Sequence, residues 1–403
     1  MDDATGERAW TRRLAVLAVV AAIAVSTIYL PQALLTDLAE NLGVAPGAAG
    51  VVATTVQAGY ALGILLLVPL GDRVQVRTQV TVQSLVLAAA LAASAALPDL
   101  VGVALGFLVV GLVANIAQII IPAANRLAPP HRRGAATGTL VGALVIGIFG
   151  GRIVASLLVD AIGWRWVVLV FAGLVLVALP FVRRALGGEL PVEGLPQSYG
   201  RLLLSTFVLA RRSPALVQSA VIQFFVFATF NSIWTVMVLH LTAPPFDWSV
   251  LGAGLFGLVG LAAGIVAPFG GRWIDRFGPM PVVGVALAVL LVATATIVVD
   301  ATAIVLFGVT MFVATWANQA IQSANQSRAL TANPGRTAPA NTFFMFMVFL
   351  GGSTGAALGP LAFADGGMPR VGELGVVLVL LAGVTWVLAA LHGRRADAAA
   401  SVS

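Results

Sequence analysis

The chain has 403 residues, of which 60% are hydrophobic and only 9% are charged, and it contains no cysteine. A soluble domain is closer to half apolar and a quarter charged, so this composition excludes a soluble fold. The missing cysteine excludes disulfides, thiol catalysis and Cys-based metal sites. The net charge of +6 comes from arginine, since no lysine is present.

Apolar runs of about twenty residues or more follow one another along the chain, and each is long enough for a helix to cross a roughly 30 Å hydrocarbon core. The short alternating segments of outer-membrane strands are not seen. We therefore predict an all-α polytopic membrane protein. Its twelve transmembrane helices are expected at residues 13–38, 46–70, 78–97, 100–125, 134–160, 164–184, 214–241, 249–271, 280–299, 301–327, 338–363 and 372–392.

The arginines are distributed unevenly between the expected loops. If the N-terminus is cytosolic, the outside loops hold only Arg165 and Arg370, and Arg152 lies within a helix. Every other arginine then falls on the cytosolic side, as the positive-inside rule requires. We therefore expect both termini in the cytosol and the protein in the bilayer of the cytoplasmic (inner) membrane. The excess of arginine over acidic residues is explained by membrane topology, so we expect no nucleic-acid partner.

The chain divides around one polar segment. Residues 1–13 carry both charge signs before a full-length apolar run, which argues against a signal peptide. The longest polar interruption, 185–213, is interpreted as a cytosolic linker with a short interfacial helix at 199–212. It separates an N-terminal six-helix bundle at 1–184 from a C-terminal six-helix bundle at 214–403.

Two Asp-Arg pairs mark equivalent places in the two bundles. Asp72-Arg73 and Asp275-Arg276 stand 203 residues apart, each between two apolar stretches. The same offset separates two further pairs, Asn115 from Asn318 and Arg133 from Arg336. A constant offset indicates a parallel duplication of six helices. Transporters built from two such halves hold substrate between them near the middle of the membrane.

The segment 68–77 resembles a loop of the major facilitator superfamily, which has the form Gly-x-Leu-small-Asp-Arg-x-Gly-Arg-Arg between the second and third helices. Here the segment reads Val-Pro-Leu-Gly-Asp-Arg-Val-Gln-Val-Arg, and it departs at Val68, Gln75 and Val76. The second copy, 271–278, keeps two glycines and the Asp-Arg pair. The resemblance covers the whole chain and implies two six-helix bundles with a transport function.

Further matches resemble the drug and metabolite exporter branch of that family. They are Tyr-Leu-Pro at 29–31, Gly-Trp-Arg-Trp at 163–166 and the glycine-rich stretch 134–160. Two positions depart from the branch: Gly147 replaces a proline, and Phe107 stands where an arginine linked to proton coupling is often found. The resemblance implies a multidrug-type efflux antiporter, while the departures leave the coupling route open.

The Asp-Arg turns supply candidates for gating: Asp72, Arg73, Arg77, Asp275 and Arg276. An aspartate at a helix N-terminus can accept backbone N–H bonds and pair with arginine of the other half. Such a cluster would latch the cytosolic side when the protein is open to the outside. The alternative is a solvated turn, in which ion pairs contribute about 0–1 kcal/mol.

Arg152 is the only basic residue deep within an expected helix, and its insertion costs at least ~2.5 kcal/mol. A partner is therefore expected, and Asp37 lies at a similar depth. The pair could be a structural clamp or an outer gate whose aspartate takes up protons. Alternatively, both side chains reach the outer headgroups separately.

By the resemblance, the first, fourth, seventh and tenth helices line a central cavity. Their polar and aromatic side chains recur at helical spacing, and amides at this depth are rarely lipid-facing. The alternative is hydrogen bonding between helices, worth about 0.6 kcal/mol each. The candidate substrate-binding residues are Tyr29, Gln32, Asn115, Gln118, Gln223, Phe227, Asn231, Trp234, Asn318 and Gln322.

Amides and aromatics with almost no charge suit a neutral or amphipathic small molecule. We expect a monomeric secondary transporter that exports such a compound in exchange for protons, with uptake or facilitated diffusion of a neutral nutrient such as a sugar as the alternative. A non-transporting receptor or sensor is a third possibility. No cofactor, metal or enzymatic activity is expected. The Gly-x-Ser-x-Gly pattern around Ser353 lies in an apolar helix and is explained by small-residue packing.

Overall fold

The computed structural model describes residues 2–187, 198–266 and 269–400, and every regular element in these ranges is a helix. Within them, the side chains of residues 2–6, 72, 269–271 and 393–400 lie outside the description. The predicted all-α fold is confirmed.

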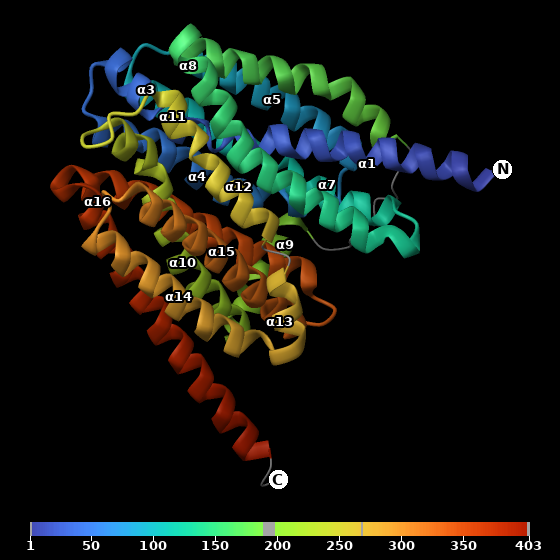
Figure 1. Ribbon diagram of the computed structural model, residues 1–403. Coiled ribbons are helices and arrows are strands. Elements are labelled where there is room, and N and C mark those ends of the chain that lie inside the picture. Colours follow the sequence, from blue (N-terminus) through green and yellow to red (C-terminus); the bar gives the residue numbers. More distant parts are fainter. Residues whose placement is uncertain (1, 188–197, 267–268, 401–403) are drawn as a thin grey trace.

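The first half of the protein runs in blue to green in Figure 1. Its elements are α1 (Asp2–Thr27), α2 (Leu30–Ala33), α3 (Leu35–Leu42), α4 (Pro46–Leu67), the 3-10 turn η1 (Pro69–Asp72), α5 (Val76–Ala96), α6 (Leu100–Val113), α7 (Ile116–Leu127), the 3-10 turn η2 (Pro130–Arg132) and α8 (Arg133–Ala185).

The helix α9 (Tyr199–Arg212) connects to the second half, which is drawn from yellow-green to red. The elements of the second half are α10 (Pro214–Thr242), α11 (Val250–Leu255), α12 (Gly257–Val266), α13 (Phe269–Phe277), α14 (Pro279–Val299), α15 (Ile304–Thr331) and α16 (Thr337–Ala400). In Figure 1, α3 and the bend of α16 lie towards one end of the molecule, whereas α9, α13 and the N-terminus lie towards the other. We call the latter the Asp-Arg end, because η1 and α13 carry the two Asp-Arg pairs.

Nine helical segments of the described chain are long and apolar enough to cross a membrane, and Val250–Val266 is apolar but shorter. Two of the nine, Pro130–Ala185 and Thr337–His392, have 56 residues each. Each contains non-helical glycine: Gly163 has φ 74° and Gly367 has φ 65°. Glycine tolerates a positive φ because it lacks a Cβ. These breaks fall where the sequence predicted loops, so each long segment can cross twice. A multi-pass protein is confirmed, and the count of twelve stays a prediction.

The first expected helix is interrupted after Thr27, and the chain resumes as the short α2 with Pro31 in its first turn. Proline lacks the N–H that would continue the ladder, so it favours a new helical start at this position. The interruption turns Tyr29 and Gln32 into the interior, where both are almost completely buried.

The two halves meet along two seams, one between α4 and α16 and the other between α8 and the pair α11 and α12. Small residues allow close approach at both seams. A Cβ added to Gly50 would lie 2.6 Å from Pro360 Cγ, and one added to Gly254 would lie 2.2 Å from Ser156 Cβ. These approaches hold helices of different halves in direct contact away from the Asp-Arg end.

The Gly-x-Ser-x-Gly pattern serves packing, as the sequence analysis expected. A Cβ on Gly351 would meet Phe224 O at 2.2 Å, and one on Gly355 would meet Ala228 O at 2.0 Å. The two glycines thus allow α16 to lie against α10. The Ser353 hydroxyl between them donates to the Thr54 carbonyl of α4 at 3.0 Å, so it contributes to the seam between the halves.

Candidate functional site

A cavity of about 1230 Å³ separates the two halves at the Asp-Arg end. Its walls come from η1, α5, α7 and α8 of the first half, from α12, α15 and α16 of the second, and from α9. No acidic residue is among its described lining residues. The polar side chains of the lining are Gln118, Asn125, Arg126, Thr137, Thr206, Gln319, Gln322, Ser323, Gln326, Thr337, Asn341 and Thr342.

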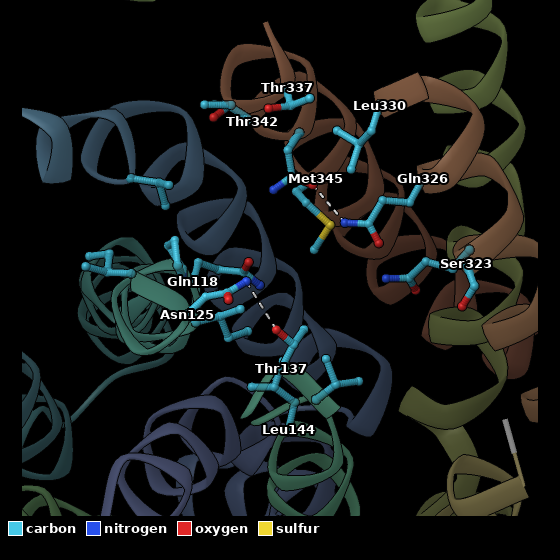
Figure 2. A pocket seen from close by; sticks show the side chains of 18 of the residues that line it. Gln118, Asn125, Thr137, Leu144, Ser323, Gln326, Leu330, Thr337, Thr342 and Met345 are labelled. Carbon is cyan, nitrogen blue, oxygen red and sulfur yellow. Dashed lines mark hydrogen bonds between the residues drawn. The ribbon is translucent and has the colours of Figure 1, made fainter. Parts of the chain in front are cut away.

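Matching polar pairs lie on opposite walls of the cavity (Figure 2). In the first half, Asn125 Nδ2 of α7 donates to Thr137 Oγ1 of α8 at 3.4 Å. In the second half, Gln326 Nε2 of α15 donates to Asn341 Oδ1 of α16 at 2.7 Å. The repeat inferred from the sequence therefore has a counterpart in the cavity walls. In each half an amide side chain links a pair of corresponding helices, α7 with α8 in the first half and α15 with α16 in the second.

The cavity ends about halfway through the molecule. Along α8 its lining reaches Val145 and Ile146, and Val145 is 12 residues after Arg133 at the Asp-Arg end. At 1.5 Å per residue this corresponds to a depth of about 18 Å. Arg152 lies two turns further along the same helix, about 28 Å from the Asp-Arg end.

Beyond the cavity, side chains of both halves close the space between them. We call this set the closure layer: Tyr29, Gln32, Tyr60, Phe149, Arg152, Phe227, Asn231, Trp234, Thr235 and Phe349. All ten side chains are less than a tenth exposed.

Aromatic contacts cross between the halves in the closure layer. The rings of Phe149 and Trp234 lie 5.1 Å apart edge to face, and those of Tyr60 and Phe349 lie 4.3 Å apart. Aromatic pairs at such distances contribute about 0.5–1.5 kcal/mol beyond the area they bury. They therefore favour the conformation in which this end is shut.

Gln32 supplies the polar part of the same closure. Its Nε2 donates to Asn231 Oδ1 at 3.2 Å and to Thr235 Oγ1 at 3.1 Å, both on α10 of the second half. Its Oε1 accepts from Arg152 Nη2. One amide thus connects three helices and uses its donor and acceptor sides at once.

Arg152 is only 6% exposed and is surrounded by rings. Its guanidinium carbon lies 4.7 Å from the ring centre of Tyr29, 5.1 Å from that of Trp234 and 5.4 Å from that of Phe149. Each cation–π contact contributes about 0.5–2 kcal/mol, which offsets part of the cost of burying the charge. The Nε and Nη1 donors are buried and have no hydrogen-bond partner within the described residues.

The expected ion pair between Asp37 and Arg152 is not formed in the structure. Asp37 Oδ2 instead accepts from the backbone N–H of Trp164 at 2.8 Å. Trp164 begins the helical run after the break at Gly163, and a helix N-terminus attracts a carboxylate. From the sequence, residues 161–163 were expected to form a loop of unknown geometry. The sequence therefore could not show that the Trp164 N–H would be free to bind Asp37 in place of Arg152.

The Asp-Arg turns are not joined across the halves in this conformation, as far as the described side chains show. The side chain of Asp72 lies outside the description, and Asp275 and Arg276 are exposed. Arg276 lies over the ring of Phe277 at 5.1 Å, while two buried donors of Arg73 have no partner among the described side chains. Arg77 is exposed. Since the cavity opens at this end, the expected latch stays a prediction for the opposite conformation.

The ten candidate substrate-binding residues fall into three groups. Gln118 and Gln322 line the cavity. Tyr29, Gln32, Phe227, Asn231 and Trp234 belong to the closure layer. The remaining three are hydrogen bonded within one half, as the alternative interpretation allowed: Gln83 donates to Asn115 at 3.2 Å, and Gln223 donates to Asn318 at 3.4 Å.

Sequence reasoning missed most of the cavity wall contributed by α8 and α16. On α16, Thr337, Asn341 and Met345 all line the cavity. Their spacing of four residues places them on one helix face. This spacing could have identified them as cavity-lining residues from the sequence. On α8, Gly138 and Gly142 also face the cavity, with nothing within 4 Å of an added Cβ. The glycine-rich stretch is thus partly a cavity wall.

The helix expected at 199–212 coincides with α9, Tyr199–Arg212. Its Leu202 and Thr206 line the cavity. The Tyr199 hydroxyl donates to the Leu66 carbonyl of the first half, whereas Phe207 packs at 6.2 Å against Phe343 of the second. Burial raises the pKa of Tyr199, and the charge of Arg73 opposes this shift. The phenol is therefore neutral and able to donate at physiological pH.

Comparison with known proteins gives concordant results. A model described as Major Facilitator Superfamily matches residues 15–356. The chain is 30% identical over 383 residues to the uncharacterized transporter YgaY of Escherichia coli O157:H7, covering 93% of this chain and 94% of that protein. It is 33% identical over 358 residues to the probable transporter SCO4007 of Streptomyces coelicolor, covering 88% and 82%.

Among solved structures, a peptide transporter POT in complex with alafosfalin superposes with a TM-score of 0.75 at 14% sequence identity. The match covers 94% of this chain and 95% of that one. At this identity the likeness concerns the fold.

Proposed function

Because the chain belongs to the Major Facilitator Superfamily and is a membrane transporter of that type, we propose that it exports a small amphipathic or neutral organic compound by alternating access. The observation that carries the proposal is the cavity between the halves, which opens at the Asp-Arg end and is shut at the other end by the closure layer. Rocking of the halves about this central region would open the far end and close the near one.

The orientation proposed is the one favoured by the arginines, with the termini and the Asp-Arg end in the cytosol of the cytoplasmic membrane. The cavity then faces the cytosol, and its apolar wall with amides suits a compound that carries both apolar and hydrogen-bonding groups. Protons are the proposed driving ion. Proton exchange rests on the resemblance to the exporter branch, since the described cavity lining offers no carboxylate.

Alternating access can be tested with engineered cysteines, because the natural chain contains none. A Cβ built on Gly47 lies 3.6 Å from Ala364 Cβ across the α4–α16 seam, which is within the range for a disulfide. The double variant Gly47→Cys/Ala364→Cys should therefore cross-link readily at the far end. The double variant Thr137→Cys/Asn341→Cys joins opposite cavity walls and should cross-link only when the cavity has closed.

We expect both pairs to form in the purified protein, each in a fraction of the molecules, with the single-cysteine variants as controls. Locking the far end should stop transport. If the cavity pair never reacts, or if the protein locked at the far end transports at the full rate, alternating access would be contradicted.

The transported class and the coupling can be read from proteoliposomes that contain the pH dye pyranine. Phenylalkanols, phenylalkanoates and phenylalkylamines serve as amphipathic probes, and hexoses serve as neutral nutrients. Proton exchange predicts that an amphipathic probe changes the lumenal pH, whereas hexoses do not. The amide-rich wall also fits a sugar, and hexose equilibration without any pH change would favour that second candidate.

A further inference from the structure

We propose that Arg152 is the substrate-recognition residue for a single anionic group, so that the transported compound is an amphipathic organic monoanion such as a carboxylate. This inference rests on the proposed transport function and narrows its substrate class. The relevant features are the isolation of the Arg152 charge, its free donors, its place between the halves and the rings around it.

The charge of Arg152 has no counter-ion within the described structure. Arginine stays protonated in proteins, so the guanidinium is a permanent cation. The nearest candidate identified from the sequence, Asp37, is bonded to Trp164 N instead. No carboxylate belongs to the closure layer or to the described cavity lining. A buried cation held only by an amide and ring faces is a strong site for an incoming anion.

Two of its donors are available for that anion. Nη2 donates to Gln32, while Nε and Nη1 are buried without a partner in the part of the chain that the structure describes. Buried donors are usually paired, and unpaired ones need an explanation such as a ligand. If this side chain served packing alone, an uncharged residue could take its place, because replacing a buried charge by an apolar side chain often leaves stability unchanged or raises it.

Arg152 also lies where the two halves part. Trp234, which covers its guanidinium at 5.1 Å, belongs to the second half, as do Asn231 and Thr235, which bond Gln32. When the halves rock, Trp234 would move off the guanidinium, and Asn231 and Thr235 would leave Gln32. An anion loaded from the cytosol into the inner end of the cavity, two helical turns away, would then meet the guanidinium with Gln32 beside it.

The surroundings define the rest of the compound. Tyr29 and Phe149 remain with Arg152 in the first half and present ring faces next to the charge. They can pack against an apolar or aromatic body attached to the anion. The open cavity on the other side holds no described acidic side chain that would repel an anion, and it exposes Arg126 in its wall.

The membrane potential would add to the proposed proton exchange as a driving force for an anionic cargo. A cell-interior-negative potential drives a monoanion outwards. The direction of this force agrees with the proposed export and opposes uptake.

The test measures ligand-induced thermal stabilisation of purified full-length protein at constant ionic strength and neutral pH. The probes are benzoate, phenylacetate and phenylbutyrate, compared with the matching alcohols and primary amines. We expect a concentration-dependent rise in Tm with at least one carboxylate and a weaker response to its alcohol and amine. Arg152→Gln should raise the apparent Kd of that carboxylate at least about tenfold, as the loss of a charge-assisted contact predicts.

Two further variants keep the test decisive. Arg165→Gln removes a nearby cation outside the closure layer, where Arg165 lies over Trp164 at 4.5 Å, and it should change the carboxylate Kd less than about twofold. Gln32→Glu places an internal carboxylate on the atom that already accepts from Arg152. It should abolish the response to carboxylates even if Arg152→Gln fails to fold. In the free protein the new ion pair is offset by the loss of the Gln32 Nε2 bonds to Asn231 and Thr235.

Equal stabilisation by all three probe classes, no response to any carboxylate, or a carboxylate response retained by Gln32→Glu would overturn the proposal. The cysteine pairs at Gly47/Ala364 and Thr137/Asn341 report alternation without any ligand. If both pairs still form while carboxylates fail, the anion preference is wrong and alternating access stands. If the cavity pair never forms, alternating access itself is wrong.

Discussion

Gln32 and Asn231 lie in different halves of the protein, yet Gln32 Nε2 donates to Asn231 Oδ1 over 3.2 Å. This bond joins the halves at the end where the cavity is shut. Because the same Gln32 accepts from Arg152, the closing contact between the halves and the buried charge share one side chain. Any movement that opens this end must therefore change the environment of Arg152.

The first prediction concerns the contribution of that bond to closure. Asn231→Ala removes it, and hydrogen bonds between membrane helices contribute about 0.6 kcal/mol on average. The ratio of molecules shut at the far end to molecules open there should therefore fall by a factor of about three, measured as the rate of cross-linking in the Gly47→Cys/Ala364→Cys background. As the matched control, Gln83→Ala breaks a bond inside the first half and should leave that rate unchanged. Unchanged cross-linking in Asn231→Ala would show that this bond does not contribute to closure.

The second prediction compares two glycines of α16. A Cβ on Gly355 would lie 2.0 Å from the backbone carbonyl of Ala228, so Gly355→Ala must push α16 away from α10. Overpacking of this kind costs about 1–3 kcal/mol, seen as a lower Tm. Gly383→Ala, with nothing within 4 Å of the new Cβ, should be neutral or stabilising by up to about 1 kcal/mol. Equal effects at the two sites would contradict the packing described here.

The third prediction separates the structural role of Asp37 from proton coupling. Asp37→Ala removes the acceptor for Trp164 N–H and should destabilise the protein by about 0.5–2 kcal/mol, as the loss of a helix cap does. Asp37→Asn keeps an acceptor oxygen and should lose less. If the carboxylate only caps this helix, Asp37→Asn transports with the pH dependence of the wild type. A changed pH profile would revive its assignment as a proton site.

The fourth prediction concerns pH and Asp300, which lies in the turn between α14 and α15. Its Oδ1 accepts from the Thr302 hydroxyl and backbone N–H, both at 2.8 Å, and from Ala303 N–H at 3.2 Å. The hydroxyl bond and the backbone bonds lower the pKa of Asp300 below its ordinary value. A depressed folded pKa stabilises the protein above the unfolded pKa, and this stability is lost as the pH falls through the folded pKa.

Asp300→Ala should therefore lower the Tm at neutral pH, and the difference from the wild type should shrink as the pH falls below about 4. A constant difference between Asp300→Ala and the wild type across this pH range would contradict the role of the ionised carboxylate in this turn.

The all-helical, multi-pass fold could be predicted because its two signals can be read directly from the sequence. They are the length of the apolar runs and the constant offset of 203 residues between matching motifs. The long-range geometry of single side chains could not be predicted in this way. Gln32 and Asn231 were expected to line one cavity, but they bond to each other, because which end is shut depends on the relative tilt of the halves. Likewise, Asp37 and Arg152 share a depth in the membrane, but depth does not determine the direction in which a side chain points around its helix.

The connecting helix α9 has a mechanical consequence for the whole protein. It is bonded to the first half through Tyr199 and packs on the second through Phe207, eight residues and about 12 Å further along the helix. We expect these two contacts to tether the halves at the cavity mouth, so that the halves pivot about α9 and the tether limits how wide a cargo molecule can enter.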